Sequence, residues 1–436
     1  MMTKLRHYLQ QIRSSFWFVP AVIVLGAVVL ATVLIAVDAT ADLNVVERWP
    51  LLFGAGAAGA RGLLGAVAGS MITVAGVVFS ITLVALSLTS SQYTPRVIRI
   101  FMRDRFNQVV LGVFVGIFAY CLVVLRAIRG GDEGGFVPSL AVMAGLILAF
   151  VGIAFLIHFI HHIAMSIQAS SIIATTARET IAAVDRLFPE ELDGDEDEEA
   201  DDSRWKSLMK QPWSDVPARR TGSIENVDTD ALLDAARKCS TILRMERGIG
   251  EFVIEGAPIV SVIDPGGLDD ETTAEINAAY VIGRQRMVET DAGFGIRQIV
   301  DIAMKALSPG INDTTTAVMC VDYLAAILVR LAARRIAVSH RLDRGKLRVI
   351  ARGPSFERLV AEAFDQIRQN AAGNVAIIWR MLDALQTVAG LTASPSRRRV
   401  LHEHVQWIAE LVERTIESPH DRARVESRLA RMREAL

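Results

Sequence analysis

Hydroxyl side chains recur at a fixed interval within one long apolar stretch of the chain. The stretch GSMITVAGVVFSITLVALSLTSSQYTPR covers residues 69–96. Four of its hydroxyls follow one another at intervals of seven residues, namely Thr73, Ser80, Ser87 and Thr94. A spacing of seven keeps side chains on one seam of a helix that supercoils left-handedly. Because oxygens that line a pore replace part of an ion's hydration shell, such a seam around a shared axis would suit a path for small ions.

Polar residues continue from this seam to the end of the stretch. Gln92 adds polarity there, and Pro95 is expected to break the helix. The arginines that would surround the mouth of a path are Arg96, Arg99 and Arg103. Rings of arginine favour anions. Close packing between helices is the open alternative, because small hydroxyl residues are common where membrane helices approach one another.

A second group of polar side chains lies in DAGFGIRQIVDIAMKALSPGINDTTTAVMC, residues 291–320. The amides of Gly293 and Gly295 could bind an anion at the start of the following helix. The charged and capping side chains are Asp291, Arg297, Asp301, Lys305, Asn312 and Asp313. Those spaced four apart share one helix face, so the segment could form one polar site for a ligand or a neighbouring subunit. Helix pairing and capping without any ligand is the alternative interpretation.

Three histidines, His158, His161 and His162, follow the fourth apolar segment. Their spacing places them on one helix face, which is compatible with metal binding or with pH sensing. No nearby Cys, Asp or Glu in the sequence completes a metal shell, so we predict no metal site. Anchoring of the rings at the membrane interface is the simpler alternative.

The elements that must position these residues are mostly membrane helices. The mean hydropathy of +0.36 is too high for an ordinary soluble protein. Segments that approach the roughly 20 apolar residues of a spanning helix are Phe16–Val37, Gly62–Thr89, about Gln108–Leu125 and Pro138–Ile160. The first resembles a signal peptide, but its apolar run exceeds the usual signal core, so we predict that it is retained.

Basic residues predict the orientation of these spans. The tail before the first span carries Lys4, Arg6 and Arg13, and the loop after the second is also arginine-rich. Positively charged loops stay on the cytoplasmic side, and an even number of spans separates these two. Both termini are therefore expected in the cytoplasm.

The rest of the chain is predicted to form a cytoplasmic part. The fourth span should continue as a helical neck to Pro189, followed by the acidic run PEELDGDEDEEADD, which is too charged to bury surface. Three β-prone runs, Ser240–Met245, Glu251–Ile254 and Ile259–Ile263, alternate with glycine turns and predict a small lipoyl-like β-barrel. No lysine stands at a hairpin tip, so we expect no attached cofactor. Beyond these runs, apolar residues at helical spacing predict a series of helices. Their ranges are Leu268–Met287, Phe294–Leu307, Thr314–Ala333, Ser355–Ala389 and Arg397–Glu417, and a last helix begins at Ser418-Pro419.

Composition and motifs argue against several function classes. The formal net charge of −2 gives no reason to expect a nucleic-acid partner. The three cysteines have neither metal nor redox spacing. Asp291, Asp301 and Asp313 could be imagined around a metal, but no nucleophile–base pair accompanies them. We therefore expect no catalytic residues, no cofactor and no enzyme.

The chain resembles a known bacterial family in three stretches. FGIRQIVDIAMKALSPGINDTTTA, MITVAGVVFSITLVALSLTSSQYTPR and GEFVIEGAPI are similar to the family of predicted membrane proteins called domain of unknown function 2254. Members carry a proline after the Asn-Asp pair, where this chain has Thr314. The resemblance implies a four-span inner-membrane protein with a cytoplasmic domain, and it implies no reaction.

Together these patterns predict an α-helical polytopic protein of the bacterial inner membrane with a cytoplasmic α+β domain. Its predicted parts are a four-helix transmembrane domain (1–165), a helical neck and flexible acidic linker (166–220), the small barrel (221–265) and a mainly helical domain (266–436). The expected function is a homo-oligomeric channel for small ions in the lipid bilayer, lined by the second span and gated from the cytoplasm. The alternative is a non-conducting sensor or scaffold that binds a ligand or partner through residues 291–320.

Overall fold

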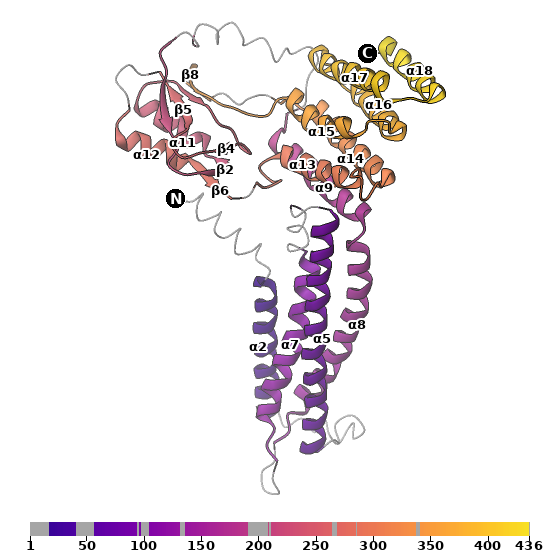
Figure 1. Ribbon diagram of the computed structural model, residues 1–436. Coiled ribbons are helices and arrows are strands. Elements are labelled where there is room, and N and C mark those ends of the chain that lie inside the picture. Colours follow the sequence, from indigo (N-terminus) through magenta and orange to yellow (C-terminus); the bar gives the residue numbers. More distant parts are fainter. Residues whose placement is uncertain are drawn as a thin grey trace. The chain divides into compact units, whose positions relative to one another are not determined.

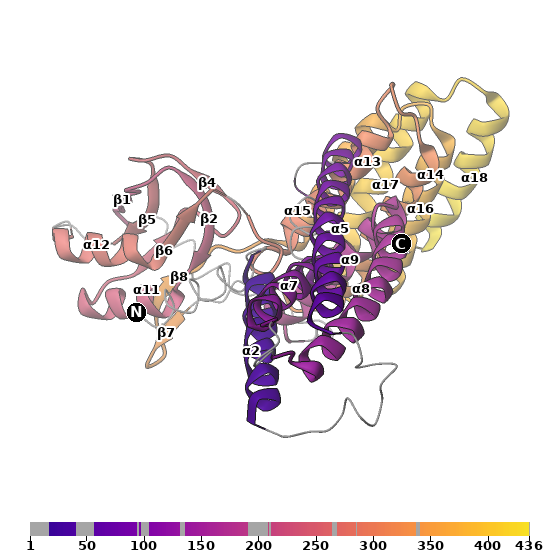
Figure 2. The ribbon, with the colours of Figure 1, turned by 90° about the horizontal axis from the view of Figure 1, so that it is seen from below.

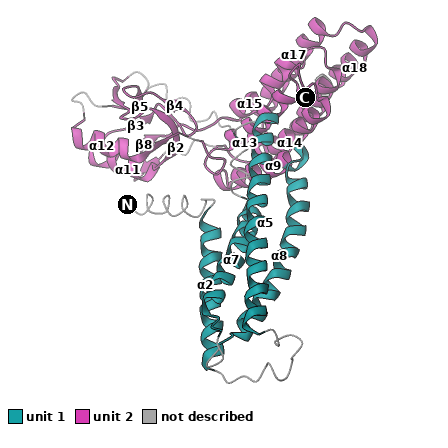
Figure 3. Ribbon diagram, turned by 60° about the horizontal axis from the view of Figure 1, so that its bottom comes forward, with its two compact units in different colours: residues 1–171 teal, residues 172–436 magenta. Residues whose placement is uncertain are grey.

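The computed structural model describes residues 17–40, 56–93, 96, 104–130, 136–190, 208, 211–263, 268–284, 286–336 and 341–435. The chain divides into two compact units, residues 1–171 and 172–436, which are coloured separately in Figure 3. The first unit holds the long apolar helices. The second holds the strands and the remaining helices.

The first unit is built from long helices that agree with the predicted spans. They are α2 (Phe18–Thr40), α5 (Ala57–Gln92), α7 (Arg105–Ala127) and α8 (Ser139–Ser166), shown in Figure 1. Within the described residues, 5 helices are long and apolar enough to cross a membrane. The fifth is α14 (Thr314–Ala332), which belongs to the second unit.

Helix α5 buries one narrow face inside the first unit. The buried residues from its second turn onward are Leu64, Ala68, Met71, Ala75, Val78, Thr82, Ala85 and Thr89. Their spacing alternates between four and three, which is the pattern of left-handed helix packing. This face packs against α7 and α8.

Close helix contacts and one remote cap hold the other spans together. A Cβ atom added at Gly112 of α7 would lie 2.8 Å from Ile23 Cδ1 of α2, so a larger residue would push these helices apart. Asp38 near the end of α2 accepts hydrogen bonds from the amides of Leu140 (3.2 Å) and Ala141 (3.1 Å) in the first turn of α8. Asp38 thus caps a helix about 100 residues away, as helix starts require.

The predicted continuous neck is interrupted. Helix α8 ends at Ser166, and the next helix, α9 (Ala169–Leu187), begins after two non-helical residues. The carbonyl of Ile167 at this break accepts a hydrogen bond from the Tyr93 hydroxyl, at 3.2 Å. This contact comes from residues far apart in the sequence, which helical periodicity does not report.

The strands of the second unit form two open sheets, seen in Figure 2. One has the order β1 (Ser214–Pro217), β5 (Pro258–Val262), β3 (Leu243–Met245), β8 (Lys346–Ile350) and β7 (Arg341–Asp343). The other has the order β4 (Phe252–Val253), β2 (Gly222–Val227) and β6 (Tyr280–Gly283). Helices α11 (Thr229–Lys238) and α12 (Asp270–Ala279) pack beside the sheets around a core that includes Leu232, Ile259 and Ile276.

The predicted β-barrel is therefore wrong. Neither sheet closes on itself among the described residues, because the outer strands of each have one neighbour only. The three β-prone runs do form strands, but β4 joins one sheet while β3 and β5 join the other. Strand β3 also pairs in parallel with β8, which lies about a hundred residues later in the chain. Local alternation predicts strands and not their partners.

The other helices of the second unit follow the predicted order with two corrections. Besides α9 and α14, they are α13 (Ala292–Ala306), α15 (Phe356–Asn370), α16 (Val375–Gly390), α17 (Pro395–Thr415) and α18 (Pro419–Ala435). The predicted helix 355–389 is two helices, because Gly373 has φ +72° and Asn374 caps α16 through the Ile377 amide (3.3 Å). The predicted helix 268–287 ends at Ala279, where the chain turns into β6 and pairs with β2.

A buried histidine of α17 lies beside α15. His404 is 1% exposed, and its ring meets Trp407 edge-on with 4.6 Å between ring centroids. Burial lowers the pKa of His404 from 6.5 to about 4, and the Asp365 carboxylate 3.9 Å from its Nδ1 only partly offsets this effect. The neutral ring is therefore the form that the fold accommodates.

We expect acid to destabilise the protein through this histidine. The lowered pKa means that the unfolded chain binds the proton first, so stability is complete above pH 6.5 and falls as pH decreases toward about 4. The full loss amounts to about 3 kcal/mol, at 1.36 kcal/mol per pKa unit. Thermal unfolding of wild type and His404→Leu should show a smaller pH dependence in the variant. Equal pH dependence in both proteins would contradict this assignment.

Candidate functional site

The hydroxyl row of α5 lies on the face opposite its buried face. Thr73, Ser80 and Ser87 are all exposed. At about 100° per residue, they stand roughly half a turn of the helix away from the buried seam. Thr94 lies outside the described residues. Gln92 is exposed as well, but it follows Ser87 by five residues and so points about 140° away from the row.

Small residues extend this outward face toward the start of α5. A Cβ atom added at Gly62, Gly65, Gly69 or Gly76 would meet no other atom within 4 Å. Among the described residues of the first unit, these glycine positions of the outward face are therefore not used for packing. Larger apolar side chains on its flanks are exposed, including Phe79 (46%) and Leu88 (43%).

The hydroxyls differ in their hydrogen bonds. Thr73 Oγ1 donates to the Gly69 carbonyl at 2.8 Å, and the buried Thr82 donates to Val78 in the same way. For Ser80 and Ser87, the part of the chain that the structure describes provides no side-chain hydrogen bond. A hydroxyl facing lipid normally bonds back to its own helix. Two that do not are suited to water or to a neighbouring molecule.

The arginines predicted at the mouth are only partly placed. Arg96 is exposed just beyond the end of α5. Arg99 and Arg103 lie outside the described residues. The structure thus neither assembles nor separates the predicted ring of arginines.

The three histidines of α8 have different environments. His161 is exposed. The His158 ring meets Phe106 edge-on, with centroids 4.7 Å apart. His162 is half-buried, and its Nε2 lies 2.6 Å from Asp104 Oδ2. No group of three potential metal ligands occurs within the described residues.

Asp104 is the partner that sequence reasoning missed. Its second carboxylate oxygen accepts a hydrogen bond from the Phe106 amide at 2.9 Å, so the same side chain caps α7 and binds His162 of α8. An aspartate directly before an apolar run is a capping signal, which the sequence does contain. Its pairing with a histidine 58 residues later could not be read from spacing.

Several polar residues of 291–320 are engaged within the chain. Asp291 caps α13 through the Phe294 amide (3.2 Å) and pairs with Arg286 Nε (2.8 Å). This carboxylate occupies the helix start where an external anion was predicted. Arg297 pairs with Glu362 of α15, while Lys305 is exposed. Asp301 is half-buried one turn before Lys305.

The two predicted helix starts lie at opposite ends of α13. Asp313 caps α14 by accepting hydrogen bonds from the Thr316 amide (3.0 Å) and hydroxyl (2.5 Å), which lower its pKa. Asn312 adopts φ +49°, and its backbone N–H donates a hydrogen bond to the Ser308 carbonyl. Because 15 residues separate Asp291 from this turn, about 22 Å lies between the two caps. They do not form the single polar site that the sequence suggested.

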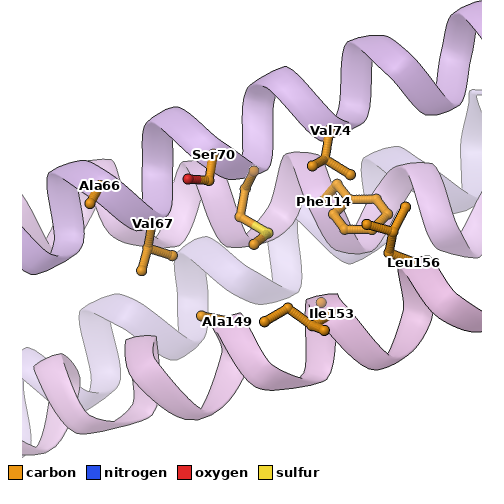
Figure 4. A pocket seen from close by; sticks show the side chains of 10 residues that line it. Ala66, Val67, Ser70, Val74, Phe114, Ala149, Ile153 and Leu156 are labelled. Carbon is orange, nitrogen blue, oxygen red and sulfur yellow. The ribbon is translucent and has the colours of Figure 1, made fainter.

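A shallow apolar pocket of about 330 Å³ lies between α5, α7 and α8 (Figure 4). Its lining residues are Ala66, Val67, Ser70, Met71, Val74, Phe114, Ala149, Gly152, Ile153 and Leu156. It contains none of the predicted site residues. With one hydroxyl in its lining, this pocket is suited to an apolar chain and not to an ion.

Comparison with known proteins places most of the chain in one family. The family model described as a predicted membrane protein, DUF2254, matches residues 13–387. The chain belongs to the DUF2254 family. An uncharacterised protein of Mycobacterium bovis is 34% identical over 385 residues, which cover 86% of this chain and 73% of the relative. Uncharacterised proteins from two strains of Mycobacterium tuberculosis match at the same identity and coverage. No solved structure gives a significant match.

Membership of DUF2254 confirms the resemblance, and the chain is accordingly a predicted multi-pass membrane protein. The SPGIND run that carried the resemblance is the turn between α13 and α14 in this structure. Its exposed residues include Ile311, at 46%. In this DUF2254 chain the run therefore ends one helix and caps the next.

Proposed function

We propose that the protein is a homo-oligomeric channel for small ions whose path is lined by the outward face of α5. The observation that supports this most directly is the pair Ser80 and Ser87, exposed on that face without a hydrogen bond inside the described chain. In lipid such hydroxyls gain nothing, whereas water in a path would satisfy them.

The position of the row is the reason for an oligomer. The opposite face of α5 is already buried against α7 and α8. A path along the row therefore lies outside each protomer and must be enclosed by several copies. The arginine-rich sequence after α5 would give this path a basic mouth, which favours small anions.

We further propose four spans with both termini in the cytoplasm. The fifth apolar helix, α14, packs against α13 and α16, and its Leu324, Ile327 and Leu328 are fully buried. This packing suits the core of a water-soluble domain. An even number of spans agrees with the basic residues of the N-terminal tail and of the sequence after α5. The second unit would then be cytoplasmic and placed to gate the path.

Accessibility to water tests the direction of the row. In membranes that contain the full chain, Ser80→Cys and Ser87→Cys should react with a charged, water-soluble thiol reagent. Phe79→Cys and Leu88→Cys are matched controls, exposed on the flanks of the same helix, and should not react. The chain without these substitutions measures the background reaction of the native cysteines. Cys121 and Cys320 are buried, so this background comes from the partly buried Cys239.

Two outcomes would contradict a water-filled path. If none of the four thiols reacts, the row faces lipid or is sealed. If Ser80→Cys resists the reagent but forms disulfides between copies on oxidation, the row is a packing seam between helices. Reaction at the row and not at the flanks supports the proposal.

A further inference from the structure

Two large apolar side chains of the second unit are exposed on the edge strand β4 and directly after its end. Phe252 is 61% exposed and Ile254 is 62% exposed, while Val253 between them is buried. Alternation along a strand places Phe252 and Ile254 on the same side. Among the described strands, β4 lies at the edge of its sheet and pairs with β2 alone.

Residues 218–223 lie beside β4 and the turn that follows it, and they carry two arginines. The Ala218 amide donates to the Ala257 carbonyl at 2.8 Å, and the Gly256 amide donates to the Ala218 carbonyl at 2.9 Å. Further along, Ser223 is the register partner of Phe252. Arg219 and Arg220 therefore lie in the segment that flanks the exposed apolar pair.

These arginines are available for an anionic partner. Arg219 and Arg220 are exposed, and neither has an ion-pair partner within the described residues. Other arginines of the second unit are paired, for example Arg237 with Asp343 and Arg358 with Glu251. The surface formed by Arg219, Arg220, Phe252 and Ile254 is called the basic–apolar patch below.

We propose that the basic–apolar patch binds the surface of an anionic lipid bilayer. Phenylalanine and isoleucine enter the boundary between headgroups and acyl chains, and adjacent arginines are attracted to anionic headgroups. The patch belongs to a chain with several membrane helices, so its local concentration near a bilayer is high without a second partner. Glu255 at the rim of the patch is exposed and opposes the attraction, so binding should depend on the anionic lipid content.

A fluorescent reporter in the patch can test this contact. The full chain with Cys239→Ser and Ile254→Cys is labelled with an environment-sensitive dye. It is placed, one copy per nanodisc, in phosphatidylcholine with or without phosphatidylglycerol. With phosphatidylglycerol, we expect a blue shift and quenching by lipids that carry a quencher in the upper acyl chain. High salt should weaken both effects.

Matched variants distinguish the contact from a general change. A reporter at Leu342→Cys on β7, which is 59% exposed in the other sheet, should not respond to phosphatidylglycerol. Adding Arg219→Gln and Arg220→Gln should remove the response of the Ile254→Cys reporter. The labelled variants should unfold at the same temperature as the parent, since all four patch residues are exposed.

The proposal would be overturned by either of two results. A reporter that remains in water in both lipid mixtures shows that the patch touches no bilayer. A blue shift that appears only when two copies share a disc, and that survives the arginine substitutions, assigns the patch to contact between copies. Neither result depends on whether the protein conducts ions.

Discussion

Replacing Gly295 with alanine is expected to destabilise the protein by about 1–3 kcal/mol, although alanine normally favours a helix over glycine. A Cβ atom at this position of α13 would lie 2.0 Å from Thr180 Oγ1 and 2.9 Å from Thr180 Cβ. Thr180 cannot turn aside easily, because it is buried in α9 and donates to the Thr176 carbonyl at 2.7 Å. The two helices must therefore separate, which loses packing along their contact.

A second helical glycine provides the control. Gly390 in α16 has no atom within 4 Å of an added Cβ, so Gly390→Ala should be neutral or stabilising by up to about 1 kcal/mol. Thr180→Gly combined with Gly295→Ala should recover part of the lost stability, because it removes the atoms that clash. Denaturant or thermal unfolding measures all three. An unfolding midpoint of Gly295→Ala equal to that of wild type would contradict the close contact.

Replacing Arg397 with methionine is expected to cost a similar amount, about 1–3 kcal/mol. Arg397 is 1% exposed at the start of α17, and its Nη1 donates to the carbonyls of Leu331 (3.1 Å) and Ala332 (3.0 Å). The Ala332 carbonyl ends α14, where carbonyls lack helical partners, whereas the Leu331 carbonyl also accepts from the Arg334 amide at 3.0 Å. Methionine fills part of the volume but leaves the Ala332 carbonyl without a donor among the described residues.

Arg399 is the matched control for this substitution. It is an exposed arginine two residues further along α17, so Arg399→Met should change the unfolding free energy by less than about 0.5 kcal/mol. Arg397→Lys keeps the charge but loses the planar donor geometry, and it should fall between wild type and methionine. Equal unfolding midpoints for Arg397→Met and Arg399→Met would show that the buried guanidinium is not needed.

Hydrophobic periodicity predicted the elements that are long and repetitive. The apolar runs fixed the positions of α2, α5, α7 and α8 to within a few residues, except at the start of α5 and the end of α8. The capping residue Asp313 marked a true helix start, because its side chain bonds an amide only three residues further along the chain. These features depend on neighbours in sequence.

Features that depend on distant partners could not be predicted in this way. The prediction of a barrel was wrong because β3 pairs with β8, a distant strand. The prediction of an anion site at the start of α13 was wrong because the Asp291 carboxylate occupies that position. The sequence suggested that the backbone N–H of Gly295 binds an anion, whereas the structure shows that its lack of a Cβ atom allows close contact with Thr180. The pairing of Asp104 with His162 joins two helices that no spacing rule connects.

Ion conductance of the purified protein in planar bilayers tests the central claim most directly. The account predicts that the wild type conducts small ions, that Ser80→Leu and Ser87→Leu reduce the current strongly, and that Phe79→Leu leaves it unchanged. Wild-type protein that is folded and inserted but passes no current, across different salts and pH values, would contradict the account.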